Sequence, residues 1–272
     1  MVEIIAHRGA RSLAPENTLA AARLAHRLGA HRWETDANLT MEGQLVLFHD
    51  DTLTRCTNAA NEFAYDPEQP GGQDRLRSYT MMELELLEAG AYFERTDPYD
   101  TLNEIDPKDL ASYREERIPS LYDGLVLTRE LKWTINIELK DYGNEPELGF
   151  MVSRTLTDIA RAGIAHDRVV ISSFNHAWLR QVRDRAPEIE VQALVGWDDD
   201  VPLDFNSPVF TNGEFQVLNI NANLIIPRDI KALKAAGRRI NLFTVNEPHD
   251  YMRFVNAGAD GIITDYPQRF LK

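Results

Sequence analysis

Short apolar segments rich in Val and Ile alternate with segments of helical spacing along most of this 272-residue chain. Strands separated by helices are typical of parallel βαβ units, because a parallel strand needs a crossover connection long enough for a helix. The expected strands span 2–7, 31–36, 44–49, 134–139, 168–174, 190–196, 216–223, 239–245 and 261–265. The expected helices span 18–29, 149–163, 176–186, 227–237 and 248–258.

This repetition predicts an α/β fold, with a (β/α)₈ TIM barrel as the leading architecture and an open doubly wound sheet as the alternative. The nine expected strands are one more than a barrel of this kind holds, so one of them is surplus. A chain of 272 residues has the length of a one-domain barrel. We therefore expect residues 1–272 to form a single barrel domain.

Residues 51–117 interrupt the alternation of strands and helices. This segment is polar and contains the turn-rich stretches YDPEQPGG, TDPYD and IDPKD. One stretch, 80–93, fits a helix. Because a structureless loop of this length is uncommon, we interpret 51–117 as a subdomain inserted after the third strand, where it can cap the catalytic face of a barrel.

The charge of the chain restricts its partners. The formal net charge is −14, which argues against nonspecific binding to nucleic acids and to anionic membranes. An anionic small-molecule substrate would need local cations or a metal ion to be held. With Cys56 as its single cysteine, no signal-peptide pattern and no apolar stretch of membrane-spanning length, the chain is expected to be cytoplasmic, without a stable membrane anchor.

The stretch RWETD at 32–36 places two carboxylates on one strand. Residues two apart on a strand share a face, so Glu34 and Asp36 are neighbours there, and like charges repel unless something holds them together. The connection to the next strand is too short for a crossover helix, and Glu42-Gly43 indicates a two-residue hairpin turn. Such a turn places His49 opposite Asp36, and a bulged turn would shift this register by one residue.

Polar side chains follow four of the expected strands, at the points where these strands end. They are His7 and Arg8, Glu34 and Asp36, His49 and Asp50, and Glu138 and Lys140. Polar residues at the ends of apolar strands are typical of the catalytic rim of a barrel. The carboxylates of Glu34, Asp36 and Glu138 could bind a hard divalent cation, Mg²⁺ or Ca²⁺, whereas the scarcity of Cys and His makes zinc less suitable.

The sequence also resembles a known family. The stretches concerned are IAHRGARSLAPENTLAA, WETDANLTMEGQLVLFHDDTLTRCTN, IPSL, NIELK and FTVNEPHDYMRFVNAGADGIITDYP. In this order, and spanning almost the whole chain, they resemble the glycerophosphodiester phosphodiesterase family. The resemblance implies a barrel with a segment inserted after the HD motif. It also implies hydrolysis of glycerophosphodiesters to sn-glycerol 3-phosphate and an alcohol, through a cyclic phosphate formed by the neighbouring glycerol hydroxyl.

The resemblance further implies roles for seven residues at matching positions. These roles are metal binding by Glu34, Asp36 and Glu138, acid–base catalysis by His7 and His49, and phosphate binding by Arg8 and Lys140. Phe243 stands where the family usually has Trp, and it would keep an apolar wall for the glycerol or the leaving group. Glu42 and Cys56 also depart from the usual residues, and these departures concern substrate preference more than catalysis.

Other interpretations remain open from the sequence alone. Each polar residue taken singly has an ordinary structural explanation, and Arg55 fits a structural salt bridge better than a phosphate contact. The alternatives are a barrel that binds phosphodiesters without cleaving them, a lysophospholipase D-like enzyme, and an enzyme that forms cyclic phosphates. The intact His7, His49 and carboxylate set favours a hydrolase. The sequence leaves open the alcohol, the metal, which histidine acts first, the role of 51–117 and the oligomeric state.

Overall fold

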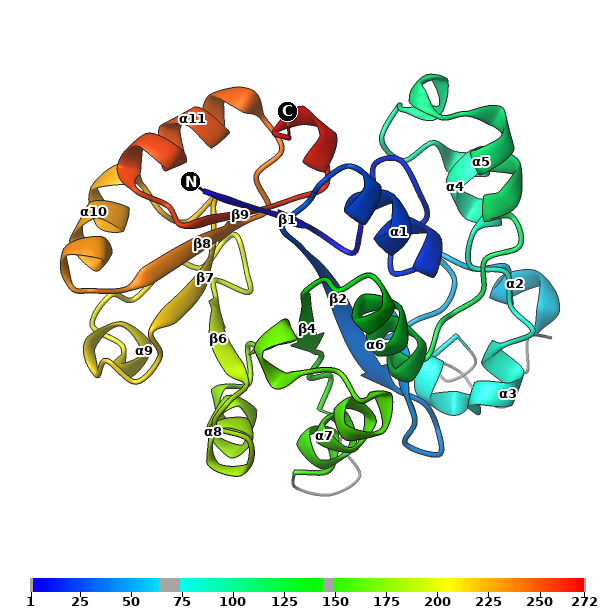
Figure 1. The fold of residues 1–272 in the computed structure, drawn as a ribbon, viewed down its shortest axis with the longest axis horizontal. Coiled ribbons are helices and arrows are strands. Elements are labelled where there is room, and N and C mark those ends of the chain that lie inside the picture. The colour runs from blue at the N-terminus through cyan, green and yellow to red at the C-terminus, as the bar shows by residue number, and fades with distance from the viewer. Residues whose placement is uncertain (1, 64–73, 144–148, 272) are drawn as a thin grey trace.

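The computed structural model describes residues 2–63, 74–143 and 149–271. Eight parallel strands form a closed barrel surrounded by helices (Figure 1), and β9 and β2 both pair with β1 to close it. The barrel strands are, in order around the barrel, β1 (Glu3–Ala6), β2 (Arg32–Leu39), β4 (Ile135–Leu139), β5 (Val169–Ser173), β6 (Glu190–Val195), β7 (Val217–Asn221), β8 (Arg239–Phe243) and β9 (Gly261–Thr264). The predicted barrel is therefore confirmed, and the alternative of an open sheet is wrong.

Helices follow most of the barrel strands and cover their outer faces. They are α1 (Leu19–Arg27), α6 (Leu121–Glu130), α7 (Phe150–Ala162), α8 (His176–Arg185), α9 (Pro208–Thr211), α10 (Pro227–Ala235) and α11 (Pro248–Ala257), with 3₁₀ turns at η3 (His166–Arg168) and η4 (Pro267–Arg269). Local sequence signals set the ends of α1. The Thr18 side chain accepts a hydrogen bond from the Ala21 N–H at its start, and Gly29 follows its end with a positive φ.

The ninth strand, β3 (Leu45–Leu47), is the surplus one. It runs antiparallel to β2 and pairs with Ala37–Leu39, on the edge of β2 where β1 has already ended. The hairpin has a three-residue loop, Met41–Gly43, because Thr40 pairs with Gln44 and Gly43 adopts φ +75°. The predicted two-residue turn is therefore wrong. Phe48, and not His49, lies opposite Asp36.

Helix α6 is absent from the sequence-based prediction. Its segment contains a glycine, which weakens a helical pattern. In the structure this position has no room for a side chain, because a Cβ on Gly124 would lie 2.8 Å from Cδ1 of Leu47. A capping box at Ser120 and Asp123 starts the helix. Close packing between α6 and β3 thus explains a glycine that the sequence alone does not.

Within its described residues, 51–63 and 74–117, the segment 51–117 contains four short helices and two 3₁₀ turns. They are α2 (Ala59–Glu62), η1 (Leu76–Ser78), α3 (Met81–Leu84), α4 (Ala91–Thr96), η2 (Leu102–Glu104) and α5 (Pro107–Tyr113). The single helix expected at 80–93 is thus two shorter helices, and the stretch YDPEQPGG at 65–72 lies outside the described residues. The segment lies beside α1 (Figure 1) and has its own hydrophobic cluster, which also includes Val46 and Phe48 from the β3 region.

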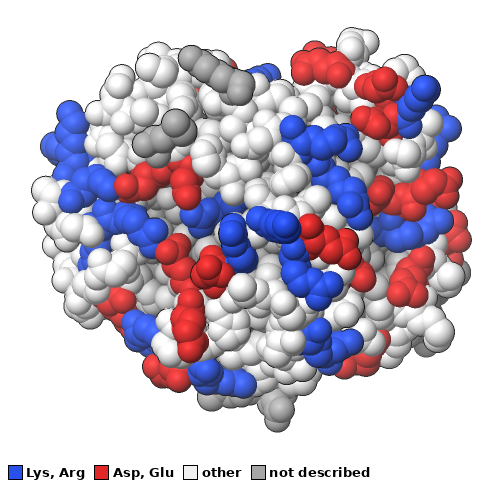
Figure 2. Space-filling view, in the orientation of Figure 1, with Lys and Arg blue, Asp and Glu red and all other residues white. Residues whose placement is uncertain are grey.

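The surface carries both signs of charge. Lys and Arg side chains alternate with Asp and Glu side chains over the face seen in Figure 2, although the chain has a net charge of −14. Among the described residues, no helix is both long enough and apolar enough to cross a bilayer.

Candidate active site

Three carboxylates meet where β2 and β4 lie side by side. Asp36 is the register partner of Glu138, and Glu34 is two residues earlier on β2. One oxygen from each of these carboxylates lies within 4.8 Å of the others. Within the described part of the chain, Glu34 Oε1 and Asp36 Oδ1 are buried and have no hydrogen-bond partner. Buried carboxylate oxygens without donors fit the oxygen-ligand set of a hard divalent cation.

The electrostatics of this trio also fit a cation. Burial, followed by the charges of Asp36 and Glu138, raises the pKa of Glu34 well above its usual value. Burial opposes ionisation of Asp36 too, but the positive charge of Arg8 outweighs it and holds the pKa of Asp36 below its usual range. Positive charge is therefore needed for all three groups to be ionised together.

Two basic side chains lie against the carboxylate trio. Arg8 Nε is 3.2 Å from Asp36 Oδ2, and its backbone N–H donates to Glu34 Oε2. Lys140 Nζ donates to Glu138 Oε1 at 2.7 Å and lies 3.6 Å from Asp36 Oδ1. The two predicted phosphate-binding residues thus border the three predicted metal ligands.

The turn after β1 positions Arg8. Arg8 itself has φ +54° and Gly9 has φ +83°. A Cβ on Gly9 would lie 2.6 Å from the backbone carbon of Ala21, so only glycine allows helix α1 to approach this closely. The glycine of the HRG motif therefore brings the start of α1 toward the site. Asn17, just before α1, donates to Asp36 Oδ2 at 2.9 Å.

His7 lies at the end of β1 and is paired with Asp265 at the end of β9. Its Nδ1 is 2.6 Å from Asp265 Oδ1, and its Nε2 is 3.9 Å from Glu34 Oε2. Asn246 donates to the other oxygen of Asp265. Burial, together with the charge of Arg8, lowers the pKa of His7 to about 4, although Asp265 opposes this shift. His7 is therefore neutral at pH 7, with one nitrogen held by a carboxylate and the other facing the trio.

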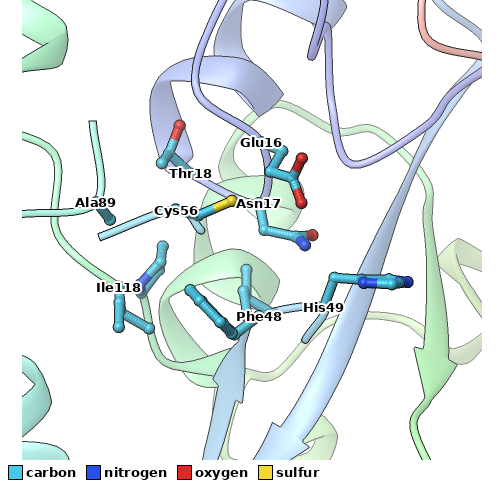
Figure 3. Close-up of a pocket in the computed structure, with 10 residues that line it drawn as sticks. Glu16, Asn17, Thr18, Phe48, His49, Cys56, Ala89 and Ile118 are labelled. Atoms are coloured by element: carbon cyan, nitrogen blue, oxygen red, sulfur yellow. The ribbon is translucent and has the colours of Figure 1, made fainter. Parts of the chain in front are cut away.

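His49 is held in a similar way. Its Nδ1 is 2.6 Å from Asp50 Oδ1, and Arg55 Nε donates to Asp50 Oδ2 at 2.6 Å. Figure 3 shows the His49 and Phe48 side chains pointing in opposite directions, as consecutive residues of an extended chain do. Phe48 packs into the hydrophobic cluster of segment 51–117, and His49 is left on the other side.

Glu16 connects the turn that carries Arg8 with the segment that carries Arg55. Its carboxylate accepts hydrogen bonds from Arg8 (2.7 Å), Arg11 (2.5 Å) and both terminal nitrogens of Arg55. Burial opposes its ionisation, but Arg8, Arg11 and Arg55 hold the pKa of Glu16 well below its usual value. The expectation that Arg55 forms a structural salt bridge is confirmed, since it connects Glu16 with Asp50.

Phe243 lies at the end of β8, on the other side of the rim. Its ring is 6.1 Å from Phe174 and perpendicular to it, and Phe174 in turn contacts Trp197 at 4.9 Å. These aromatic side chains form an apolar wall beside Lys140, whose Nζ is 5.3 Å from the Trp197 ring.

Sequence reasoning missed two of the residues that support this site, Asp265 and Glu16. From the sequence Asp265 is assigned no role, yet closure of the barrel pairs Ala6 with Thr264 and so makes His7 and Asp265 neighbours. The expectation of a closed barrel already implied this contact, because the first and last strands of such a barrel pair. Glu16 carried no comparable signal, because Arg8 and Arg11 share its irregular β1–α1 connection and Arg55 comes from a different segment.

Comparisons with known proteins agree with this geometry. The model of the glycerophosphoryl diester phosphodiesterase family matches residues 7–269. A glycerophosphodiester phosphodiesterase of Caldanaerobacter subterraneus subsp. tengcongensis is 31% identical over 276 residues, which cover 98% of this chain and 96% of the relative. One from Bacillus altitudinis is 29% identical and covers 100% of this chain and 98% of its own. The solved structure of an Oleispira antarctica phosphodiesterase in complex with the product sn-glycerol-3-phosphate is 26% identical. Its TM-score is 0.77, and the match covers 98% of this chain and 94% of that chain.

Proposed function

The chain belongs to the glycerophosphoryl diester phosphodiesterase family, and from this premise we propose that it hydrolyses glycerophosphodiesters to sn-glycerol 3-phosphate and an alcohol, with a divalent metal ion and two histidines. The observation that carries the proposal is the arrangement at the barrel rim. Two histidines, each held through Nδ1 by a carboxylate, share this rim with three carboxylates that could hold a metal. Arg8 and Lys140 both lie against Asp36, one of these carboxylates.

Glu34, Asp36 and Glu138 would hold the metal ion. Their oxygens are close enough together and lack enough donors to fit a hard cation, with Mg²⁺ as the first choice and Ca²⁺ as the second. Such an ion, when bound, offsets the negative charge that grows on the phosphate oxygens toward the transition state. Arg8 would add a planar guanidinium that matches two phosphate oxygens, and Lys140 a point charge.

The two histidines would transfer the protons. In the first step the glycerol hydroxyl next to the phosphate attacks phosphorus, and its proton passes to one histidine. The new O–P bond forms as the P–O bond to the alcohol breaks, and the other histidine protonates the leaving oxygen. Water then opens the cyclic phosphate in the same manner, with the two histidines in exchanged roles. Asp265 and Asp50 keep Nδ1 of each ring occupied, which leaves Nε2 for the transfer.

The test is release of sn-glycerol 3-phosphate from glycerophosphocholine and glycerophosphoglycerol, measured with EDTA and then with added Mg²⁺ or Ca²⁺. We expect EDTA to stop the release and one of the two ions to restore it. Release that continues unchanged in EDTA would contradict metal dependence. No release under any of these conditions would favour a barrel that binds phosphodiesters without cleaving them.

A second candidate function is hydrolysis of lysophospholipids. The loop after β6 exposes apolar side chains at the rim, with Trp197, Val201 and Phe205 exposed by 63%, 58% and 37%. Exposed apolar groups beside a site suit a substrate with an acyl chain. Lysophosphatidylcholine, added to the same assay, distinguishes the two functions by the product formed, which is lysophosphatidic acid in place of sn-glycerol 3-phosphate.

The metal site has its own test. Glu34→Gln removes a carboxylate whose Oε1 has no hydrogen-bond donor among the described residues, so we expect it to weaken metal binding by about tenfold to a hundredfold, by analogy with the loss of a supporting metal-site group. Titration calorimetry with Mg²⁺ or Ca²⁺ measures this directly. Glu247→Gln, at a carboxylate exposed by 70%, is the matched control. Equal metal affinity in both variants would exclude Glu34 as a ligand.

A further inference from the structure

A cavity opens at the carboxyl ends of β6, β7 and β8, on the same rim as the proposed catalytic residues. Its volume is about 600 Å³, within the range of small-molecule sites. It is lined by Trp197, Asp198, Asp199, Asn221, Asn223, Phe243 and Thr244. Because the carboxyl ends of all barrel strands meet at one rim, this cavity and the carboxylate trio share that rim.

Trp197 connects the cavity to the catalytic residues. The ammonium of Lys140, which donates to Glu138, lies 5.3 Å from the centre of the Trp197 ring. The edge of Phe174 contacts the same indole at 4.9 Å, which fixes its position. The indole is nevertheless 63% exposed, so most of its surface is available to a ligand. A phosphate held by Lys140 would thus place one of its substituents next to this ring.

The lining of the cavity also carries negative charge, on Asp198 and Asp199. Asp199 accepts hydrogen bonds from the side-chain amides of Asn221 (2.7 Å) and Asn223 (3.3 Å), which fix its carboxylate at the cavity. Asp198 lies next to it and accepts from the Asp200 N–H. Over residues 2–63, 74–143 and 149–271, no Lys, Arg or His lies within ion-pairing distance of Asp198 or Asp199. The cavity therefore combines an aromatic surface with two carboxylates whose charge is not compensated.

We propose that this cavity binds the alcohol part of the substrate and selects alcohols that carry a positively charged ammonium group. The assignment rests on the proposed function, because it takes the phosphodiester to be held at Lys140 and the trio. An ammonium attached to the alcohol would meet the indole face and the carboxylates of Asp198 and Asp199. A neutral alcohol would gain neither interaction, and an anionic one would be repelled. The net charge of −14 acts in the same direction, since it disfavours substrates with a net negative charge.

The experiment compares two substrates of the same shape. One is glycerophosphocholine, and the other is the 3,3-dimethylbutyl ester of sn-glycerol 3-phosphate, in which carbon replaces the nitrogen. Because the ammonium also makes choline a better leaving group, the informative quantity is the change in the ratio of their kcat/KM values between variants. The chemical difference between the two alcohols is the same in every variant and cancels.

The test variant is Asp198→Asn/Asp199→Asn, and the matched control is Asp200→Asn/Asp204→Asn, which removes two charges from the same loop but none from the cavity lining. We expect the ratio to fall about tenfold in the test variant, because the cation loses two nearby carboxylates while the indole of Trp197 stays in place. In the control the ratio should stay within about twofold of the wild type. An equal ratio in the two variants would overturn the proposal, as would a loss of kcat/KM that is the same for both substrates.

A binding measurement separates this proposal from the proposed function. Trp33, Trp133 and Trp178 are buried, so Trp197 is the one exposed tryptophan of the four in the chain. We expect tetramethylammonium chloride to change the tryptophan fluorescence with saturation, and tert-butanol to cause no saturable change. The apparent Kd should rise about tenfold in Asp198→Asn/Asp199→Asn. No saturable change in the wild type would overturn the subsite, whether or not the enzyme releases sn-glycerol 3-phosphate. Saturable binding without such release would overturn only the proposed function.

Discussion

Asp265 and Asp50 each lie 2.6 Å from Nδ1 of a histidine, and the two pairs come from different parts of the chain. A neutral imidazole that donates from Nδ1 has its lone pair on Nε2. Each carboxylate thus fixes both the orientation and the tautomer of its histidine. The His7 side chain is 14% exposed and the His49 side chain 28%, so the two rings differ in their access to water.

Replacing either histidine tests the acid–base assignment. We expect His7→Gln and His49→Gln each to lower kcat by about 10²–10⁴-fold, the contribution of a positioned acid or base. The melting temperature should change little for His49→Gln, because that ring is partly exposed. His249→Gln, at a ring exposed by 87%, is the control and should have the wild-type kcat. A histidine whose replacement leaves kcat unchanged has no part in proton transfer.

Cys56 shows how burial controls a reactive group. It is 4% exposed, and burial raises the pKa of its thiol to about 12. Its side chain lines a small cavity with Asn17 and Phe48 (Figure 3). Since the thiolate is the reactive form, we expect no labelling of the native protein by iodoacetamide at pH 8 and complete labelling in 6 M guanidinium chloride. Mass spectrometry detects the adduct, and rapid labelling of the native protein would show that the segment around Cys56 opens.

At the scale of elements, the segment 51–117 packs against the residues that hold His49. Its hydrophobic cluster includes Phe93 and Leu84, both fully buried, and Phe48, the residue before His49. Arg55 extends from the same segment to Asp50 and Glu16. We propose that 51–117 is an inserted subdomain that supports His49 through these contacts.

Phe93→Ala tests this role. Removing a fully buried aromatic ring should lower the free energy of unfolding by about 3–5 kcal/mol. Met82→Ala, at a side chain exposed by 75%, should change it by less than about 0.5 kcal/mol. Urea unfolding measures both, and the kcat of Phe93→Ala at a temperature where it is folded shows whether the cluster also positions His49. A loss for Phe93→Ala no larger than that for Met82→Ala would mean that this cluster adds little stability.

The elements differ in how well the sequence predicts them. Most barrel strands are short runs rich in apolar residues between turn or helix signals, and β2, though polar, precedes a short hairpin, so all eight could be predicted. The hairpin register was off by one because a two-residue and a three-residue loop can both be built around Glu42-Gly43. Helix α6 was not predicted because its glycine, Gly124, weakens the helical pattern. The reason for this glycine is its close contact with Leu47, which exists only in the folded chain. Contacts between segments, and not local preferences, decide both cases.

At the scale of the whole molecule, the residues proposed for the site could be predicted from the sequence, but the ionic contacts that hold them in place could not. Glu34 and Asp36 are two apart on one expected strand, and Glu138 lies near the end of the next parallel strand. The local sequence pattern is enough to predict both facts. That these three carboxylates come together follows from the closed barrel. The role of Glu16 could not be predicted, because it depends on Arg55, which comes from another segment and meets Glu16, Arg8 and Arg11 only in the fold.

The ion pairs of Glu16 with Arg8, Arg11 and Arg55 make the stability of the whole protein sensitive to acid. Arg8, Arg11 and Arg55 hold the pKa of Glu16 well below its usual value, despite burial. The unfolded chain therefore takes up a proton at Glu16 near pH 4.5 while the folded chain does not. The stabilisation is complete above about pH 5 and is lost as the pH falls through 4.5 toward the folded-state pKa.

Glu16→Gln tests this dependence. At pH 7 we expect it to lower the free energy of unfolding by about 3–5 kcal/mol, because it leaves buried arginines without their partner. The difference from the wild type should narrow as the pH falls from 5 to 3. Guanidinium unfolding at several pH values measures it, with Glu247→Gln as a control. A difference that is independent of pH would mean that Glu16 is not ionised in the native state.

The pairing of β1 with β9 has a consequence for biosynthesis. His7 and its partner Asp265 are 258 positions apart, so a ribosome must make all of the chain between them before the two can meet. A nascent chain that ends before β9 already contains both histidines and all three carboxylates, yet it has neither the strand that closes the barrel nor the group that orients His7. We therefore expect a chain that ends before β9 to lack both the closed barrel and the His7–Asp265 contact.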